Sequence, residues 1–291
     1  MTRRTEILGQ LERIPALSPD SVLAVRELND PEGDLDRAMR AIACMPELTA
    51  DILRLANSAH YGGMRTIGSM REALVLLGAR QVARLIMATS VAPLCRREVR
   101  GYALSPGDLL KHSVAVGIAA DLLASKAGGL DAVDPFTAGL LHDLGKTVLG
   151  AHLEVEVEPI LALAFDQHLS FEQAEAHVLG IDHAEAGAFL LERWGLPASL
   201  VAAVRHHHEP ETFEGNEHAR QLVDIVHVAN TLVLETGIGA GVDGMNYHVS
   251  SEAAQRLGMT ARYAESVVGG MLERFDGMRE LIEAMGGSKG S

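Results

Sequence analysis

Apolar residues recur at spacings of three and four along most of the chain, which is the period of a helix with one buried face. One such stripe runs through Ile52, Leu55 and Ala56, and another contains Val82 and Leu85. Runs that alternate Val, Thr and Tyr with polar residues, which are typical of strands, are missing from the sequence. The pattern therefore predicts an all-α protein.

Proline and serine positions predict where helices begin. Pro46 suits the first turn of a helix, and Ser69 followed by Glu72 forms a capping-box pattern. Ser105 and Pro106 begin a long helix that carries His112. We expect about 12 to 14 helices in all, and those of the second half include the ranges 134–150, 155–168, 171–179, 183–194, 197–208, 217–235 and 260–284.

The composition supports helices and narrows the choice of partners. Of the 291 residues, 47% are hydrophobic and only 4% are aromatic, so the core is built mainly from aliphatic residues, which favours helices over sheets. The net charge is −14. Because recognition of nucleic-acid phosphates needs many Lys and Arg residues, we expect no nucleic-acid partner.

The sequence also predicts a cellular compartment. No segment approaches the ~20 apolar residues of a membrane span, and no signal-peptide pattern opens the chain. Cys44 and Cys95 lie in apolar settings without CxxC spacing, which predicts buried thiols. We therefore expect a cytoplasmic protein with no membrane partner and a flexible tail at residues 286–291.

The residues that could bind a metal or take part in catalysis are a series of histidines and one aspartate. His112 is followed by the pair His142-Asp143, by His183, and by the run His206–His208. Imidazole and carboxylate together are the ligand set of a mid-row divalent metal, and apolar neighbours predict a partly buried site. Each residue also has a structural interpretation: a core histidine for His112, a helix start for His183, and a helix end for the run.

Two sets of motifs resemble the HDOD domain, the signalling relative of the HD and HD-GYP phosphohydrolases. The first half carries PELTADILRLANSAHYG and IGSMREALVLLGARQVARLI, and the second carries GLLHDLGK, GIDHAEAGAFLLERWGLP and AVRHHHEP. The resemblance implies two lobes, an N-terminal helical lobe at residues 1–100 and an HD-like helical lobe at residues 101–285. It also implies a bacterial signal-transduction protein that acts through protein–protein contacts.

By this resemblance, seven residues occupy metal-ligand positions: His112, His142, Asp143, His183, His207, His208 and Asn230. Asn230 stands where the enzymes have a late aspartate. An amide oxygen is a neutral, weaker ligand than a carboxylate, so metal affinity should fall, although the imidazoles could still hold Fe, Mn, Zn or Ni. Asp224 is six helical residues away, about 240° around the axis, and we expect it to point elsewhere, as a cap or surface residue.

The resemblance leaves two functions open. Lys146 follows the His-Asp pair by one helical turn, where in the enzymes such a lysine steadies a phosphate; it could equally balance Asp143. The Gly-Tyr-Pro motif of the cyclic-dinucleotide enzymes is absent from residues 155–168. The favoured interpretation is an adaptor with a degenerate metal pocket, whose signalling partner the sequence does not identify. The alternative is a metal-dependent phosphohydrolase with Lys146 as a catalytic residue.

Two smaller expectations concern surfaces. In the family motif Leu-Ala-Asn57-Ser58-Ala59, a structural role is favoured, in which Asn57 and Ser58 end a helix or fix the following turn. The functional alternative is that Asn57 and Tyr61 line a groove that receives a partner segment. We also expect that a homodimer could form through the helix at residues 260–284.

Overall fold

The computed structural model describes residues 2–58, 61–62, 65–127, 135–244 and 247–286. Within these ranges the chain forms helices and an isolated β-bridge between Val99 and Leu104, with no strand, which confirms the all-α prediction. Most of the tail expected at residues 286–291 lies outside the described ranges. The first six α-helices are α1 (Arg3–Leu11), α2 (Pro19–Asn29), α3 (Leu35–Ala43), α4 (Pro46–Ala56), α5 (Met70–Leu77) and α6 (Ala79–Cys95).

The second half contains the remaining helices. These are η1 (Arg100–Tyr102), α7 (Asp108–Ala127), α8 (Pro135–Leu141), α9 (Lys146–Gln167), α10 (Phe171–Leu179), α11 (His183–Arg193), α12 (Ala198–His206), η2 (Pro210–Thr212), α13 (Glu217–Leu234), η3 (Val242–Gly244), α14 (Ser251–Arg256), α15 (Ala261–Gly277) and α16 (Arg279–Gly286). The described chain thus has 16 α-helices and not 12 to 14. One reason is that the helix expected at 260–284 breaks at Met278 into α15 and α16.

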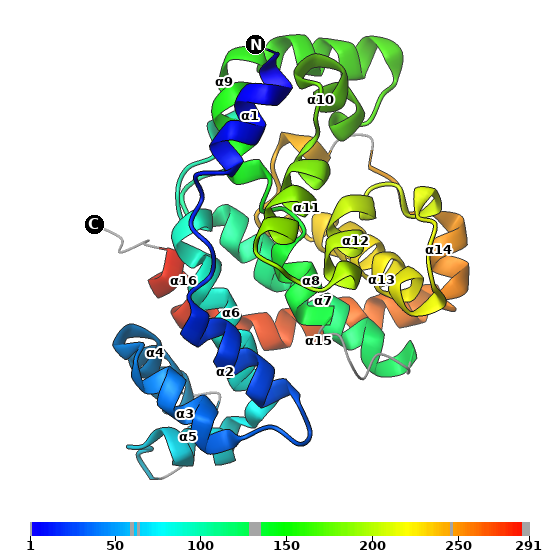
Figure 1. Ribbon diagram of the computed structural model, residues 1–291. Helices are drawn as coiled ribbons and strands as arrows, with labels where there is room; N and C mark the ends of the chain where they lie inside the picture. Colours follow the sequence, from blue (N-terminus) through cyan, green and yellow to red (C-terminus); the bar gives the residue numbers. More distant parts are fainter. Residues whose placement is uncertain (1, 59–60, 63–64, 128–134, 245–246, 287–291) are drawn as a thin grey trace.

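Helices α2 to α6 gather at one end of the molecule (Figure 1). Helix α2 packs against both α3 and α6, and α5 packs against α4 and α6. The predicted start of α5 is confirmed, because the Ser69 side chain accepts a hydrogen bond from the backbone N–H of Glu72 at 3.2 Å. Pro46 occupies the first position of α4, as expected.

Asn57 ties the end of α4 to the loop that follows it. Its side-chain amide donates to the carbonyl oxygens of Leu53 and Ile67 at 2.8 and 2.9 Å, and its Oδ1 accepts from the Ile67 N–H at 2.8 Å. These bonds match the structural role that was favoured for this motif. Ala59 lies outside the described residues, and the groove-lining alternative stays a prediction.

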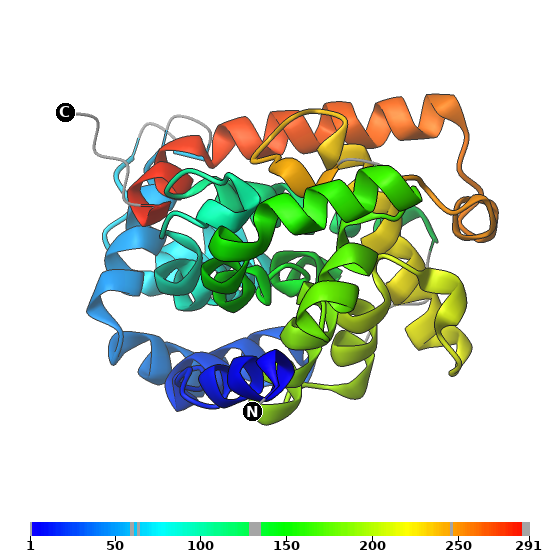
Figure 2. The ribbon, with the colours of Figure 1, turned by 90° about the horizontal axis from the view of Figure 1, so that it is seen from above.

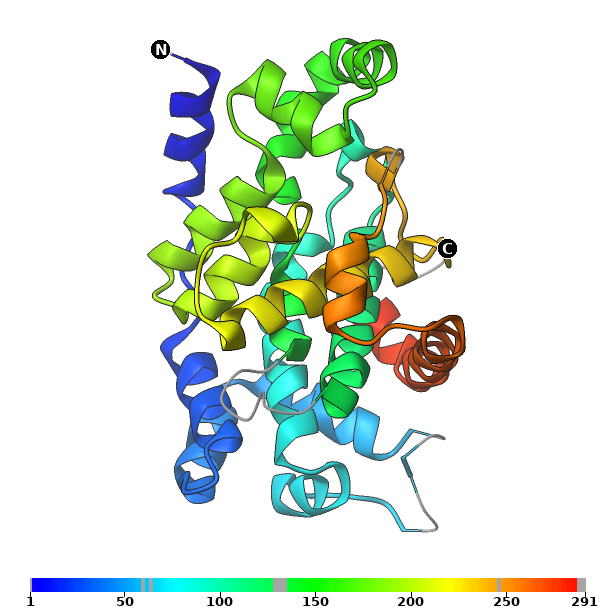
Figure 3. The same cartoon turned by 90° about the vertical axis from the view of Figure 1, so that its right-hand side faces the viewer.

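Helix α7 is the central element of the second half. It packs against α8, α13 and α15, while α12 bridges α11 and α13. Helix α15 runs along one long edge of the molecule (Figure 2). The N-terminal α1 lies at the far end from α2 to α5, beside α9 and α11 (Figure 3).

Contacts cross the lobe boundary expected near residue 100, which itself stays a prediction. Arg4 of α1 donates to the Gly180 carbonyl at 2.7 Å and pairs with Glu185 of α11. Asp121 of α7 is paired with Arg84 of α6 and with Arg274 of α15, the latter at 3.1 Å. Because Arg84 and Asp121 are both buried, their ion pair joins the two halves where water screens it little, while Arg274 completes the triad from the surface.

Two smaller expectations have different outcomes. Among the described residues no single helix is long and apolar enough to cross a membrane, while the bent pair α5 and α6 passes the same test by length and composition. Cys95 is buried as expected, but Cys44 is exposed. The prediction for Cys44 was wrong because this residue follows the last turn of α3, and the face it occupies is turned to solvent.

Candidate metal centre

The predicted ligand residues come from five separate segments that meet in the interior. His112 lies on α7, and the pair His142-Asp143 lies in the turn between α8 and α9. His183 is the first residue of α11, the pair His207-His208 follows α12, and Asn230 lies on α13. Each of these side chains is buried or nearly so, and His142, His183 and His207 have no exposed surface. The structure therefore brings all seven predicted positions together.

The His-Asp pair lies in a turn and not in the helix expected at 134–150. Helix α8 ends at Leu141, and α9 then runs unbroken to Gln167. Gly145 explains this geometry, because a Cβ at this position would lie 1.9 Å from the carbonyl oxygen of His183. The absence of a side chain lets the turn approach the start of α11 closely enough to place Asp143 beside His183.

Asp143 is the centre of the cluster. Its Oδ2 lies 3.2 Å from His142 Nε2 and 3.7 Å from His112 Nε2, and its Oδ1 lies 3.4 Å from His183 Nε2 and 3.8 Å from His207 Nε2. Two compact sets of possible ligand atoms result, His112/His142/Asp143 and His183/His207/His208, each spanning less than 4.8 Å. One carboxylate thus faces both sets.

The hydrogen bonds of the histidines suit metal binding. The Nδ1 atoms of His142 and His207 each lie 2.7 Å from a backbone carbonyl, those of Gly139 and Val204. A carbonyl can only accept, so the hydrogen is on Nδ1 and Nε2 carries a lone pair directed into the cluster. Both Nε2 atoms are buried without a hydrogen-bond partner. Outer hydrogen bonds of this kind orient histidine ligands in metal sites.

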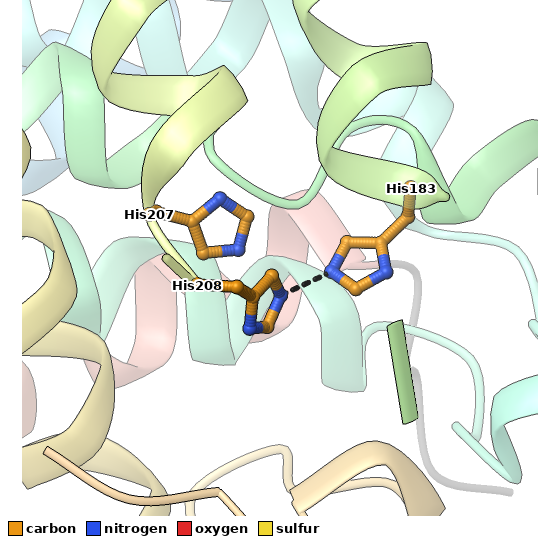
Figure 4. A group of neighbouring side chains, drawn as sticks. All are labelled: His183, His207 and His208. Atoms are coloured by element: carbon orange, nitrogen blue, oxygen red, sulfur yellow. Dashed lines mark hydrogen bonds between the residues drawn. The ribbon is translucent and has the colours of Figure 1, made fainter. Parts of the chain in front are cut away.

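His112, His183 and His208 complete the arrangement. His112 Nδ1 lies 3.1 Å from the Ile238 carbonyl, so its Nε2 also points inward. The Nε2 atoms of His183 and His208 face each other at 2.7 Å (Figure 4). In the metal-free protein an N–H of one imidazole lies between these two nitrogens, and a metal ion would take the place of that hydrogen. The orphaned, converging nitrogens therefore fit a divalent metal.

Glu175 of α10 orients His183 by accepting a hydrogen bond from the ring nitrogen that faces away from His208. The sequence did not predict this residue. Its Oε2 accepts from the backbone N–H and from Nδ1 of His183 at 3.0 and 2.8 Å, and the residue is fully buried. Burial lowers the pKa of His183, but Glu175 outweighs it, and the pKa rises to about 9. A signal existed, because Glu175 lies four residues from both Phe171 and Leu179 on the buried face of its helix.

Asn230 occupies the late-ligand position with its side chain directed at the cluster. Its Oδ1 lies 2.9 Å from His112 Nε2. Asp224 points elsewhere, as expected, and pairs with Arg256 at 2.7 Å. It is nevertheless buried, and not the cap or surface residue we expected, because Arg256 of α14 covers it. The centre therefore has Asp143 as its acidic ligand candidate among the described residues.

Lys146 adjoins the centre but is already engaged. Its Nζ donates to Asp143 Oδ2 at 2.6 Å and to Asp243 of η3. Burial lowers the pKa of Lys146, but the two carboxylates outweigh it and raise that pKa above its usual range. Asp243 was not among the predicted residues. It lies in an irregular Gly-rich segment, where no periodicity points to a buried position, so only the tertiary fold reveals it.

The buried histidines predict acid sensitivity of the metal-free protein. Burial lowers the pKa of His112 to about 4 from 6.5. Between these values the unfolded chain binds a proton that the folded centre excludes, so the free energy of unfolding should fall as the pH falls, by up to about 1.4 kcal/mol per pH unit for one such group. Urea unfolding of chelator-treated protein from pH 7 to pH 4 measures this. His112→Gln should flatten the slope, and an equal slope in both proteins would contradict the assignment.

Comparison with known proteins places this site in a family. The family model of the HDOD domain matches residues 14–210. An HDOD domain protein of unknown function from Geobacter sulfurreducens has a similar structure, with a TM-score of 0.70 at 23% identity over 98% of this chain and 96% of that one. A candidate signal transduction protein from Marinobacter aquaeolei VT8 has a TM-score of 0.74 at 21% identity, over 95% of this chain and 60% of that one. A candidate phosphohydrolase from Shewanella amazonensis SB2B has a TM-score of 0.63 at 23% identity over 97% of each chain.

Curated sequences match over shorter parts of their length. An uncharacterized protein of Treponema pallidum is 24% identical over 229 residues, which are 78% of this chain and 43% of that protein. Ribonuclease Y of Thermus thermophilus is 35% identical over 107 residues, which are 37% of this chain and 14% of the ribonuclease. The chain thus spans less than half the length of these relatives. The match of the family model to most of the chain, together with the shared all-helical fold, shows that this protein belongs to the HDOD domain family.

Proposed function

We propose that this protein is a signal-transduction adaptor whose HD-like pocket binds a divalent transition metal without hydrolysing phosphoesters. The observation that carries the proposal is the state of Lys146. This lysine, which would steady a phosphate in an enzyme, is 3% exposed and its Nζ lies between Asp143 and Asp243. A second support is Asn230, which supplies an uncharged oxygen where the enzymes have a carboxylate.

The role assigned to the metal is structural or sensory. His142, His183 and His207 would hold it through Nε2, and Asp143 would supply the negative charge. When bound, such a metal can lower the pKa of a water molecule and polarise a phosphoryl oxygen. While Asp243 is bound to Lys146, the burial of the ligands leaves little access for a phosphodiester, which favours the adaptor. Cytoplasmic action through a protein partner, the absence of a nucleic-acid partner, and a homodimer through α15 and α16 remain expectations.

The rival function is a metal-dependent phosphohydrolase, and one observation favours it. The 35% identity to ribonuclease Y over 107 residues supports phosphodiester cleavage by this chain as well. In that case Asn230 would be a tolerated ligand, and Lys146 would have to leave Asp243 to reach the substrate.

Metal analysis combined with an activity assay separates the two functions. We expect protein purified from Mn- or Fe-supplemented cells to contain at least half an equivalent of transition metal, and His142→Ala to contain under a tenth. We expect the metal-loaded protein to release no more product from bis(p-nitrophenyl) phosphate and 5′-nucleotides than metal and buffer alone. Turnover that disappears in His142→Ala would overturn the adaptor in favour of the phosphohydrolase.

Asn230→Asp tests the late-ligand position directly. The substitution adds a carboxylate beside His112 and should increase Mn²⁺ affinity about tenfold or more, which is the scale on which single ligand-shell changes act. Isothermal titration of metal-free protein measures it. Asn216→Asp is the matched control, since it adds the same charge to α13 at its N-cap, where aspartate caps equally well. Equal affinities in the two variants would show that Asn230 is not at the metal.

A further inference from the structure

The segment that joins α13 to η3 lies directly over the metal centre. The carbonyl of Ile238 accepts from His112 at 3.1 Å. Gly239, at φ +58°, packs so closely that a Cβ would lie 2.3 Å from the Asp108 carbonyl, and one on Gly241 would lie 2.4 Å from the Tyr102 carbonyl. This close backbone contact brings Asp243 to Lys146. We call residues 236–244 the covering segment.

The ammonium group of Lys146 is buried and donates to two carboxylates. An ammonium has three N–H donors and no acceptor. Two of the donors reach Asp143 and Asp243, and Nζ lies 5.5 Å from the centre of the Tyr102 ring. Since Lys146 is 3% exposed, no donor is directed to solvent. The direct way for a ligand oxygen to reach this buried ammonium is therefore to replace one of these two carboxylates.

Of the two carboxylates, Asp243 is the exchangeable one. Asp143 also lies near His142 and His183 and is 1% exposed. In the described part of the chain, Asp243 forms an ion pair with Lys146 alone. Its exposed fraction is 7%. Two carboxylates also share one ammonium, so one of them is in excess. Displacing Asp243 into water costs least, because it lies nearest the surface on an irregular segment.

We propose that Asp243 is an internal anion that occupies the position of a ligand's phosphate group at Lys146. This inference rests on the proposed function, because it concerns the same pocket. A phosphate-bearing ligand binds by exchanging with the Asp243 carboxylate and so releases the covering segment, which lies against His112 and the centre. Ligand binding in the pocket thereby becomes a movement at the surface that a partner protein can detect.

Phosphate binding to the Mn²⁺-loaded protein tests the proposal. We expect Asp243→Asn to bind inorganic phosphate at least about tenfold more tightly than the wild type in isothermal titration, because the competing charge is gone. Glu235→Gln is the matched control, since it removes one exposed carboxylate just before the covering segment and should behave like the wild type. Lys146→Met added to Asp243→Asn should abolish the gain. Equal phosphate affinity in wild type and Asp243→Asn overturns the proposal.

A second measurement needs no variant and covers the case in which Asp243→Asn fails to fold. Hydrogen exchange of the wild-type protein followed by mass spectrometry should show faster exchange in residues 236–244 when 10 mM phosphate is added, and not when chloride of equal ionic strength is added. Unchanged or slower exchange overturns the release of the segment. Failure of the proposed function has different signs: metal content near zero in every variant, or phosphoester turnover by the wild type.

Discussion

Replacing Asp143 with alanine is expected to abolish tight metal binding and to lower the free energy of unfolding of the metal-free protein by about 3 to 5 kcal/mol. Asp143 faces four histidines and is bonded to Lys146. Without it, Lys146 keeps one partner in a water-excluded site, and the histidine nitrogens lose the anion between them. Burial raises the pKa of Asp143, but His142 and Lys146 outweigh it and hold that pKa well below its usual range, so the lost group is a charged one.

Urea denaturation of chelator-treated protein and elemental analysis measure the two effects separately. Asp36→Ala is the control, because it removes an aspartate from an exposed ion pair with Arg71, where a change below about 1 kcal/mol is expected. A wild-type metal content in Asp143→Ala would show that the ion is held elsewhere. A stability equal to that of Asp36→Ala would show that Lys146 does not depend on this carboxylate.

Gly145→Ala should have a similarly large effect through sterics alone. The added Cβ would lie 1.9 Å from the backbone carbonyl oxygen of His183 and 2.8 Å from the N–H nitrogen of Gly187. Neither neighbour is a flexible side chain that can move aside, so α9 and α11 must separate. Overpacking of a rigid contact costs about 3 kcal/mol or more. The separation also moves His183 away from Asp143, so metal affinity should fall together with stability.

Gly9→Ala is the matched control for this substitution. Gly9 lies within α1 with nothing near the position of a Cβ, so alanine there should leave stability unchanged or increase it by up to about 1 kcal/mol. The same denaturation and metal-binding measurements apply to both variants. If Gly145→Ala unfolded at the same urea concentration as Gly9→Ala, the close approach of the two helices would not be what positions the His-Asp turn.

In the proposed adaptor, Asn230 and Asp243 change the charge of the pocket in opposite directions, at two different places. Asn230 removes a negative charge from the ligand shell, and Asp243 places one where a substrate phosphate would bind. The first change weakens the hold on a metal at Asp143, and the second competes with a phosphoester for Lys146. The converging histidines still fit an ion, while Lys146, the cation that adjoins them in the described part of the chain, is engaged by two carboxylates.

The sequence by itself determined the fold class and the membership of the site. Apolar residues at helical spacing were enough for the all-α prediction, since the period follows from helix geometry alone. Local rules also predicted where two helices begin, at Ser69 and at Pro46. The seven candidate ligands could be named because their order along the chain matches a family pattern, although their distances could not be known.

The tertiary structure decided what surrounds those ligands. The turn at His142 was expected to be helical, because its apolar neighbours suit a helix; contact of Gly145 with α11 overrides that preference. Asp243 was missed, since an acid far along the chain joins a site only through packing of one element on another, and Glu175 was missed although it lies on the buried face of its helix. The hydrogen bonds of Lys146 to Asp143 and Asp243 were also not predictable, because they too depend on how the elements pack. Local periodicity reports which face of a helix is buried, but only the assembled fold determines which charges meet there.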